Sequence, residues 1–320
     1  MIESTTTFDH QAAIEEYLRS HFAADNPLVT EAVRRMIAAG GKRVRPRIAL
    51  LAAEAVGAPA GEHLEIAAYM ELIHVATLIH DDVVDRADMR RGVNATAIDY
   101  GNRISVLAGD YLFAWIFRNV TARYPAPIPH ILSATLAEIC AGEVLQLRAL
   151  GELELQVTDY LDIVAKKTAS LFAASAECGA IVAGASPDDR AALRQYGYDY
   201  GVAFQIKDDL LDLTSNEARL GKPAGNDLRE RKITIPLIFA LQQANGEFRT
   251  AVERFFARGD DAQLERIVDG IRKSGALDKT GDQIDHYAQR ASRSIAGINP
   301  GPARRALLEM AAALSETAER

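Results

Sequence analysis

Residues 64–85 have the sequence LEIAAYMELIHVATLIHDDVVD, in which a long apolar segment ends in an aspartate cluster. From Leu64 to Ile79, apolar side chains occupy nearly every face of a helix with 3.6 residues per turn. A helix that is apolar all round belongs inside a large protein rather than on its surface. The segment therefore predicts a buried central helix that starts near Gly61 and reaches Asp85.

Helical signals recur on both sides of this segment, whereas the alternation of a half-buried strand is rare. Residues 186–189, Ser-Pro-Asp-Asp, combine an N-cap, a proline at the first helical position and two acids in the first turn, which predicts a helix to about Leu213. Further apolar helical segments are expected at 94–120, 127–148 and 157–184. Since no long linker and no repeat divides the chain, we expect one all-α domain over residues 1–320, with roughly a dozen helices.

The composition of the 320 residues excludes several classes of protein. Hydrophobic residues make up 48% and charged residues 25%, which is enough for a large buried core. The net charge of −8 argues against a nucleic-acid binder, which needs a basic surface. The N-terminal residues MIESTTTFDHQ lack the apolar core of a secretory signal, and no uninterrupted apolar run approaches the about 18 residues of a membrane span. We therefore expect a soluble cytoplasmic protein without a transmembrane segment.

The two cysteines, Cys140 and Cys178, lie in apolar stretches without CxxC or Cys/His spacing. Cysteines in such stretches are usually small buried residues of a reducing cytosol. We therefore expect both side chains to be buried.

Two aspartate clusters of the form DDxxD are the main candidates for chemistry. Their members are Asp81, Asp82 and Asp85 in the first cluster and Asp208, Asp209 and Asp212 in the second. Each follows an apolar helical run, so its negative charges repel one another and oppose the helix dipole. A positive group should compensate, and oxygen ligands without His or Cys indicate Mg²⁺, which typically takes one or two carboxylates plus substrate phosphates. A solvated acidic helix end is the alternative, but two chance copies in one chain are rare.

Basic residues form the second set of candidates. Residues 40–47, GGKRVRPR, place four cations in six residues after a helix-breaking glycine pair. A diphosphate site needs such groups, with lysine as a point charge and arginine as a bidentate fork. Arg90-Arg91 and Lys166-Lys167-Thr168 are weaker signals, because a basic turn alone is usually just solvated. Their presence beside two carboxylate clusters favours diphosphate chemistry.

His74 and His80 lie on the apolar helix before the first cluster. A single histidine in such a place is more often a satisfied core residue than a ligand. His74 is about two turns upstream of Asp81, which also places it within reach of a second diphosphate. Both interpretations of His74 stay open.

From about Gly40 to Pro236 the sequence resembles the trans-prenyl diphosphate synthase family, most closely its bacterial long-chain members of the octaprenyl type. The motifs that carry the resemblance are GGKRVRP (40–46), ELIHVATLIHDDVVDRADMRRG (71–92), GEVLQL (142–147), AKKTASLF (165–172), GVAFQIKDDLLD (201–212) and GKPAGNDLRERKITIPL (221–237). They occur in the family's order and are together highly specific. The resemblance implies an isoprenoid synthase fold around a deep central cavity, and a homodimer.

The resemblance also implies a role for each candidate residue. The aspartates of both clusters would hold Mg²⁺ ions that grip an allylic diphosphate, with Asp212 in a supporting place. The contacts to that diphosphate would come from Arg90, Lys167, Lys207, Lys222 and Lys232. Isopentenyl diphosphate would be bound by Lys42, Arg45, His74 and Arg91. Thr168 and Gln205 would lie beside the reacting carbon, where their dipoles stabilise positive charge.

The implied reaction is ionisation of an allylic diphosphate, from a farnesyl or geranylgeranyl primer, and attack of isopentenyl diphosphate on the carbocation. The growing chain would run along the buried helix away from Asp81. Ala76 lies about 7.5 Å along that axis with Thr77 beside it, and a small residue there leaves room for a long product. Leu132 is assigned to the floor of the tunnel. These residues favour a product of about octaprenyl length.

Three alternatives remain at this point. A medium-chain synthase would stop at geranylgeranyl or farnesyl length. A class I terpene cyclase also uses a DDxxD cluster, but it does not need residues 40–47 or a second cluster. A non-catalytic subunit of a heteromeric synthase should have lost aspartates, yet both clusters are complete. The expected binding partners are isopentenyl diphosphate and an allylic diphosphate. We expect no nucleic acid as a partner, and a peripheral membrane contact through the apolar product.

Overall fold

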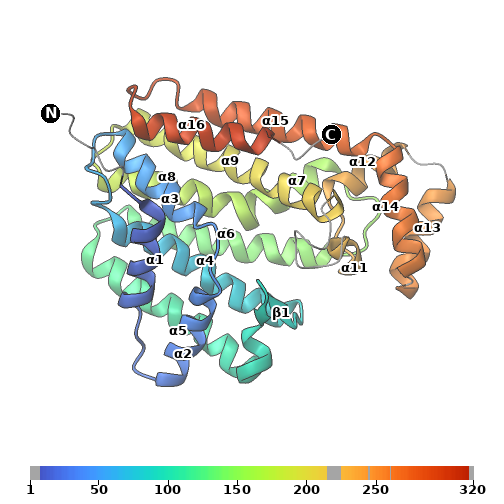
Figure 1. Cartoon of the computed structure of the whole chain (residues 1–320), viewed down its shortest axis with the longest axis horizontal. Coiled ribbons are helices and arrows are strands. Elements are labelled where there is room, and N and C mark those ends of the chain that lie inside the picture. The colour runs from blue at the N-terminus through green and yellow to red at the C-terminus, as the bar shows by residue number, and fades with distance from the viewer. Residues whose placement is uncertain (1–7, 215–224, 244–245, 260, 317–320) are drawn as a thin grey trace. The chain divides into compact units, whose positions relative to one another are not determined.

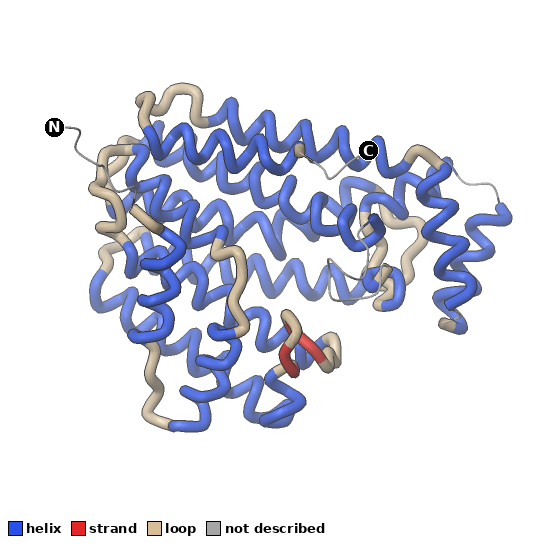
Figure 2. The backbone as a smooth tube through the Cα atoms, in the orientation of Figure 1, coloured by secondary structure: helices blue, strands red, loops and turns tan. Residues whose placement is uncertain are grey.

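A computed structural model of the chain describes residues 8–214, 225–243, 246–259 and 261–316. Nearly all of the regular structure in these residues is helical, so the prediction of an all-α fold is confirmed (Figure 1). Figure 2 shows the exception, a short antiparallel hairpin of β1 (Met89–Arg90) and β2 (Val93–Asn94).

The helices of the described residues fall into two runs along the chain. The first run is α1 (His10–His21), α2 (Pro27–Ala38), α3 (Val44–Ala55), α4 (Leu64–Val84), α5 (Thr96–Arg123), α6 (Ile128–Arg148), α7 (Val157–Val164), the π-helix η1 (Ala165–Ala169) and α8 (Ser170–Val182). The second run is α9 (Pro187–Thr214), α11 (Asn226–Arg229), α12 (Ile235–Gln243), α13 (Gly246–Arg258), α14 (Asp261–Lys273), α15 (Ala276–Ser294) and α16 (Pro302–Ser315). The apolar segments that the sequence predicted to be helical are mainly helical. Exceptions include Asn94, which lies in β2, and Gly101, whose φ of 78° and ψ of 156° interrupt α5. The segment 157–184 is divided into α7, η1 and α8.

The predicted start of α9 is confirmed by its cap. The backbone N–H of Asp189 donates to the hydroxyl of Ser186 at 3.1 Å, and Pro187 is the first helical residue. This contact satisfies one of the N–H groups that a helix leaves unpaired at its start. The described part of α9 reaches Thr214, one residue beyond the expected Leu213.

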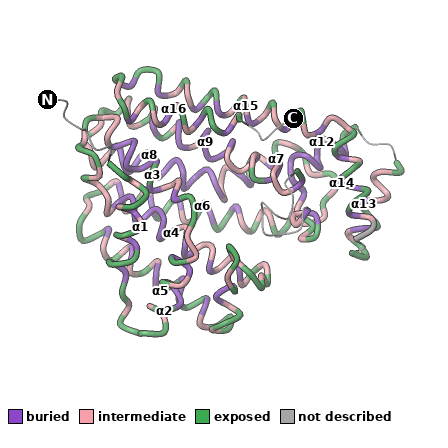
Figure 3. Tube along the Cα trace, viewed as in Figure 1, coloured by how far each residue is buried: buried purple, intermediate pink, exposed green. Residues whose placement is uncertain are grey.

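The chain divides into two compact units. The first unit contains residues 1–133, 174–194 and 297–307, and the second contains 134–173, 195–296 and 308–320. In the first unit, α4 lies against α1, α2, α3 and α5, and most of its apolar side chains are buried, as the sequence predicted (Figure 3). In the second unit, α12 packs against α7, α14 and α15. One domain over 1–320 and a deep central cavity stay predictions.

Helix α6 is more exposed than a core helix. By length and composition it is the one described helix that is apolar enough to cross a membrane, and 28% of its apolar window is buried. A single such helix is weak support for a membrane span, because core helices of soluble proteins pass the same test. Its exposed residues include Cys140, so the prediction that both cysteines are buried is wrong for Cys140 and confirmed for Cys178. An apolar sequence indicates burial only if its helix face meets another element.

Candidate active site

The first aspartate cluster lies at the C-terminal end of α4 in the first unit. Asp82 is fully buried, whereas Asp81 and Asp85 are half-buried. Arg90 donates from Nε to Oδ1 of Asp82 at 2.7 Å, and its Nη2 lies 2.5 Å from the same oxygen. The buried carboxylate thus holds a predicted diphosphate contact, Arg90, beside the cluster.

The hairpin of β1 and β2 brings Arg91 to the glycine turn at residues 40–41. Arg91 has a positive φ of 51°, and its Nη1 donates to the carbonyl oxygen of Gly40. A β-carbon on Gly41 would lie 2.7 Å from that nitrogen, which is closer than such atoms approach. The arginine side chain is flexible, so the stronger reason for glycine at residue 41 is its backbone φ of 148°, which other residues rarely adopt.

Several arginine side chains of the first unit act electrostatically on His74. Burial, followed by repulsion from Arg45, Arg91, Arg90 and Arg43, lowers the pKa of His74 well below its usual value. Arginines from two separate stretches of sequence therefore act on one half-buried ring, and together with burial they favour its neutral form. Among them, Arg45, Arg90 and Arg91 offer fork-shaped donors of the kind that suits a diphosphate. Lys42, which was also predicted to bind isopentenyl diphosphate, is exposed and directly follows the glycine turn at residues 40–41.

The second aspartate cluster lies near the C-terminal end of α9 in the second unit. Asp209 is buried and accepts hydrogen bonds from the Tyr160 hydroxyl at 2.6 Å and from Nε2 of Gln205 at 2.8 Å. The hydroxyl of Thr168 donates to Oε1 of Gln205 at 2.9 Å. The two residues predicted to lie beside the reacting carbon, Thr168 and Gln205, are thus joined to each other and to a predicted metal ligand.

The carboxylates around this second cluster crowd one another in a dry setting. Burial, together with repulsion from Asp208 and Asp212, raises the pKa of Asp209 to about 7. Burial also raises the pKa of Asp212, which accepts hydrogen bonds from the backbone N–H of Asn226 at 3.2 Å and of Asp227 at 3.1 Å. Crowded oxygen donors that resist ionisation fit a divalent cation, which would relieve the repulsion.

No three His, Cys, Asp or Glu side chains of the described residues stand close enough to hold a metal ion by themselves. Mg²⁺ is usually bound through one or two carboxylates, with substrate phosphates and water as its other ligands, and carboxylate oxygens are the donors that both clusters offer. The donor chemistry of both clusters is therefore compatible with the predicted cofactor.

Lys167 and Thr168 lie in the π-helix η1, where the backbone forms a wider turn than an α-helix. Short π-helices often occur at functional sites. Nζ of Lys167 donates to Oε1 of Gln146 at 2.6 Å and forms an ion pair with Glu143, and both partners lie on α6. A β-carbon on Gly142 would lie 2.5 Å from the backbone nitrogen of Lys167, so the GEVLQL glycine allows α6 to approach η1.

The other predicted lysines have separate surroundings. Nζ of Lys207 donates to the carbonyl oxygen of Ala313 on α16 at 2.7 Å. Lys232 forms an ion pair with Glu230 at 2.5 Å, and its charge also acts on Asp227, lowering the pKa of that carboxyl against the larger effect of burial. Lys222 lies outside the described residues.

Comparison with known proteins decides the family. The polyprenyl synthetase family model matches residues 26–271 of the chain. Octaprenyl diphosphate synthase of Escherichia coli K12 is 38% identical over 304 residues, which cover 94% of this chain and 92% of that protein. This chain belongs to the polyprenyl synthetase family. As a member of it, the chain is a prenyltransferase of the trans-prenyl diphosphate synthase type.

Two further members of the polyprenyl synthetase family are similar over nearly the whole chain. The all-trans-nonaprenyl-diphosphate synthase (geranyl-diphosphate specific) of Rhodobacter capsulatus is 37% identical, covering 93% of this chain and 92% of that protein. A polyprenyl synthase from Caulobacter crescentus CB15, whose crystal structure contains calcium and isoprenyl diphosphate, has a TM-score of 0.90 and 38% identity, covering 97% of this chain and 95% of that chain. The isoprenoid synthase fold expected from the sequence is thereby confirmed.

The three residues expected to set product length in this polyprenyl synthetase all lie in the first unit. Ala76 and Leu132 are fully buried, and Thr77 is half-buried with its hydroxyl donating to the carbonyl oxygen of His74 at 2.8 Å. Their role in product length stays a prediction.

Sequence reasoning missed three residues that contact or adjoin the candidate site. Tyr160 holds Asp209, Asp227 crowds the second cluster, and Arg43 is buried beside the glycine turn. Only Asp227 and Arg43 belong to quoted family motifs, and nothing in the sequence around Tyr160 indicates a partner 49 residues away.

Proposed function

We propose that this prenyltransferase condenses isopentenyl diphosphate repeatedly onto an allylic diphosphate until the product reaches about octaprenyl length. The observation that carries the proposal is Arg90. This residue contributes to the positive field at His74 and is also ion-paired with Asp82 of the first cluster. The cations near His74, which suit one diphosphate, thus adjoin the first aspartate cluster, which suits the metal bound to a second diphosphate. A cyclase, which binds a single diphosphate, has no need for both.

The candidate metal ligands are the six aspartates of the two clusters. When bound, Mg²⁺ supplies positive charge to the oxygens of the allylic diphosphate. The crystal structure of the Caulobacter crescentus relative, with calcium and isoprenyl diphosphate, supports this choice of a hard divalent cation.

The side chains of this chain perform the remaining tasks. Arg90, Lys167, Lys207, Lys222 and Lys232 neutralise charge that develops on the leaving diphosphate, so that the allylic C–O bond ionises. Lys42, Arg45, His74 and Arg91 bind isopentenyl diphosphate and orient its double bond toward the cation. Thr168 and Gln205, already hydrogen-bonded to each other, direct their oxygen dipoles at the positive carbon. The new C–C bond leaves positive charge on the added isopentenyl unit, and this unit then loses a proton to the departing diphosphate, so no side-chain nucleophile is required.

The length of the product is assigned from Ala76. A buried alanine five residues before Asp81 leaves space where an aromatic side chain would stop the chain early. The names of two relatives, an octaprenyl and a nonaprenyl diphosphate synthase, also support a long product. A farnesyl or geranylgeranyl primer is proposed, and a medium-chain product is the alternative outcome.

We also propose a cytoplasmic homodimer. Large apolar side chains are exposed on two helices, with Leu107 at 58% on α5 and Val144 at 56% on α6. Exposed apolar faces on a water-soluble enzyme usually mark contacts with another protein surface. The alternative to a dimer contact is that the exposed apolar side chains of α6 make a peripheral contact with the membrane that receives the product.

The test is product analysis with the purified chain, Mg²⁺, labelled isopentenyl diphosphate and a panel of allylic primers. We expect all-trans products much longer than the primer. Products that stop at geranylgeranyl length would identify a medium-chain enzyme, and a cyclic hydrocarbon formed without isopentenyl diphosphate would identify a cyclase. Failure to incorporate label with any primer, including after addition of candidate partner proteins, would contradict the proposal.

A further inference from the structure

Arg43 differs from the other cations of residues 40–47. Its side chain is fully buried, whereas Lys42 and Arg47 are exposed. Its backbone has φ 45° and ψ 43°, a left-handed conformation that residues with a β-carbon rarely adopt. Such a conformation persists only where the surroundings fix it, and it is often associated with functional sites.

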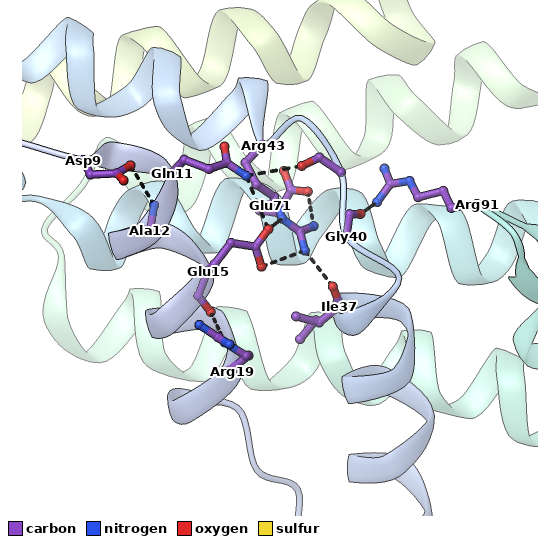
Figure 4. Close-up of polar contacts among 11 residues, drawn as sticks. Asp9, Gln11, Ala12, Glu15, Arg19, Ile37, Gly40, Arg43, Glu71 and Arg91 are labelled. Carbon is purple, nitrogen blue, oxygen red and sulfur yellow. Dashed lines mark hydrogen bonds and ion pairs between the residues drawn. The ribbon is translucent and has the colours of Figure 1, made fainter. Parts of the chain in front are cut away.

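The surroundings of Arg43 come from three helices (Figure 4). Nε donates to Oε1 of Glu15 on α1 at 2.8 Å, and Nη1 donates to Oε1 of Glu71 on α4 at 2.8 Å. Nη2 donates to the carbonyl oxygen of Ile37 in the last turn of α2 at 2.6 Å. The guanidinium therefore ties α1, α2 and α4 to the residue that precedes α3.

The charge of Arg43 is already balanced. It contacts two carboxylates, and the side chain of Glu71 is only 3% exposed. Because two carboxylates neutralise the charge of this guanidinium, it can attract a diphosphate only weakly. Arg43 therefore does not serve as a binding cation, although it lies between Lys42 and Arg45 in sequence.

The remainder of the turn is also held in place. Arg91 donates to the carbonyl oxygen of Gly40, and Nε2 of Gln11 donates to that of Gly41 at 3.4 Å (Figure 4). Glu71 lies one helical turn before His74 on α4. The same helix therefore carries the ion-pair partner of Arg43 and the histidine on which the arginines act.

We propose that Arg43 is a positioning residue for isopentenyl diphosphate. Its ion pairs with Glu15 and Glu71 hold the turn in the conformation that presents Lys42 and Arg45 to that substrate. The inference rests on the proposed function, because Lys42 and Arg45 are assigned there to isopentenyl diphosphate. A residue that only stabilised the fold would lower the amount of active enzyme without separating the two substrates.

The experiment compares Arg43→Met and Arg43→Lys with Arg190→Met, a control that removes another Arg–Glu pair of the first unit, the one with Glu177 at 2.6 Å. We expect Arg43→Met to raise the KM for isopentenyl diphosphate about tenfold or more, since small displacements of binding groups have large effects. The KM for the allylic diphosphate should stay within about twofold in the same variant. Arg43→Lys keeps the charge but loses the fork, so it should restore part of the affinity, and Arg190→Met should leave both KM values unchanged.

A folded Arg43→Met enzyme with an unchanged KM for isopentenyl diphosphate would overturn the inference, as would a parallel rise in both KM values. If Arg43→Met does not fold, Glu15→Gln decides by the same criterion, because Glu15 is partly exposed and its loss leaves the Glu71 pair in place. Calorimetric titration with isopentenyl diphosphate makes the same comparison without turnover. A wild-type chain that does not catalyse condensation would contradict the proposed function. Equal affinity of wild type and Arg43→Met for isopentenyl diphosphate would contradict only the role of Arg43.

Discussion

Nη2 of Arg90 lies 2.5 Å from Oδ1 of Asp82, so a residue of the β-hairpin is bound to the buried carboxylate of the first aspartate cluster. Asp82 has no exposed surface, and a buried carboxylate is stable only with a positive partner. In the proposed reaction both residues act on the allylic diphosphate, Asp82 through the metal and Arg90 directly. The pair therefore keeps two parts of the ionisation machinery together before substrate binds.

Asp82→Asn should nearly abolish condensation. The change removes a proposed metal ligand and the charge that holds Arg90, and we expect kcat to fall by about 10²-fold or more. Steady-state kinetics at saturating substrates and Mg²⁺ provide the measurement. Asp188→Asn, which removes one exposed carboxylate in the first turn of α9, is the control and should retain wild-type activity. Full activity in Asp82→Asn would show that the first cluster does not take part in ionisation.

The stability of the metal-free enzyme should fall as pH rises. The pKa of Asp209 is raised from 3.8 to about 7 in the folded state, so the folded protein binds its proton more tightly than the unfolded chain does. Between about pH 4 and pH 7 the folded state therefore holds more protons, and the free energy of unfolding decreases as pH increases.

Denaturant unfolding across this pH range measures the effect. Asp209→Asn, which cannot ionise, should flatten the pH dependence, and Mg²⁺ with diphosphate should stabilise the wild type more at pH 8 than at pH 5. An identical pH profile in wild type and Asp209→Asn would show that Asp209 does not govern this part of the stability.

Ala76→Tyr should shorten the product. Ala76 is fully buried on α4, and a phenol ring there would fill the space proposed for the growing chain. Condensation should continue, since the aspartates and cations are unchanged, although overpacking can cost about 1–3 kcal/mol of stability. Chromatography of the dephosphorylated products gives their length. Ala76→Ser, a nearly isosteric control, should keep the long product, and an unchanged length in Ala76→Tyr would reject the tunnel assignment.

Val144→Asp should weaken the homodimer. Val144 is 56% exposed on α6, and a buried unpaired carboxylate at an interface is strongly unfavourable. Light scattering coupled to size-exclusion chromatography should show a dimer for the wild type and a shift toward monomer for the variant. The control is Leu28→Asp, an equally drastic change at an exposed residue of α2. A wild-type monomer that binds lipid vesicles through α6 would replace the dimer proposal.

Local signals explain why much of the fold could be predicted. The cap of α9 depends on Ser186 and Asp189, three residues apart, and the burial of α4 follows from the apolar side chains of a single segment. Both are contained in a short window of sequence. The aspartates were likewise visible because each cluster occupies five consecutive positions.

Long-range pairs explain what the sequence did not indicate. Tyr160 and Asp209 are 49 positions apart, and Arg43 is 28 positions from both Glu15 and Glu71. A tyrosine on an amphipathic helix or an arginine in a basic turn has the same local pattern whether its partner exists or not. The prediction for Cys140 was wrong for a related reason, because an apolar sequence does not show which face of its helix is covered, and this side chain is exposed.

The most direct test of the central claim is the length distribution of the product formed from farnesyl diphosphate and labelled isopentenyl diphosphate. We predict all-trans diphosphates that accumulate near octaprenyl length with Mg²⁺ and no extension when the metal is chelated. Extension that is independent of divalent metal, or a product no longer than the primer under every condition, would contradict the account.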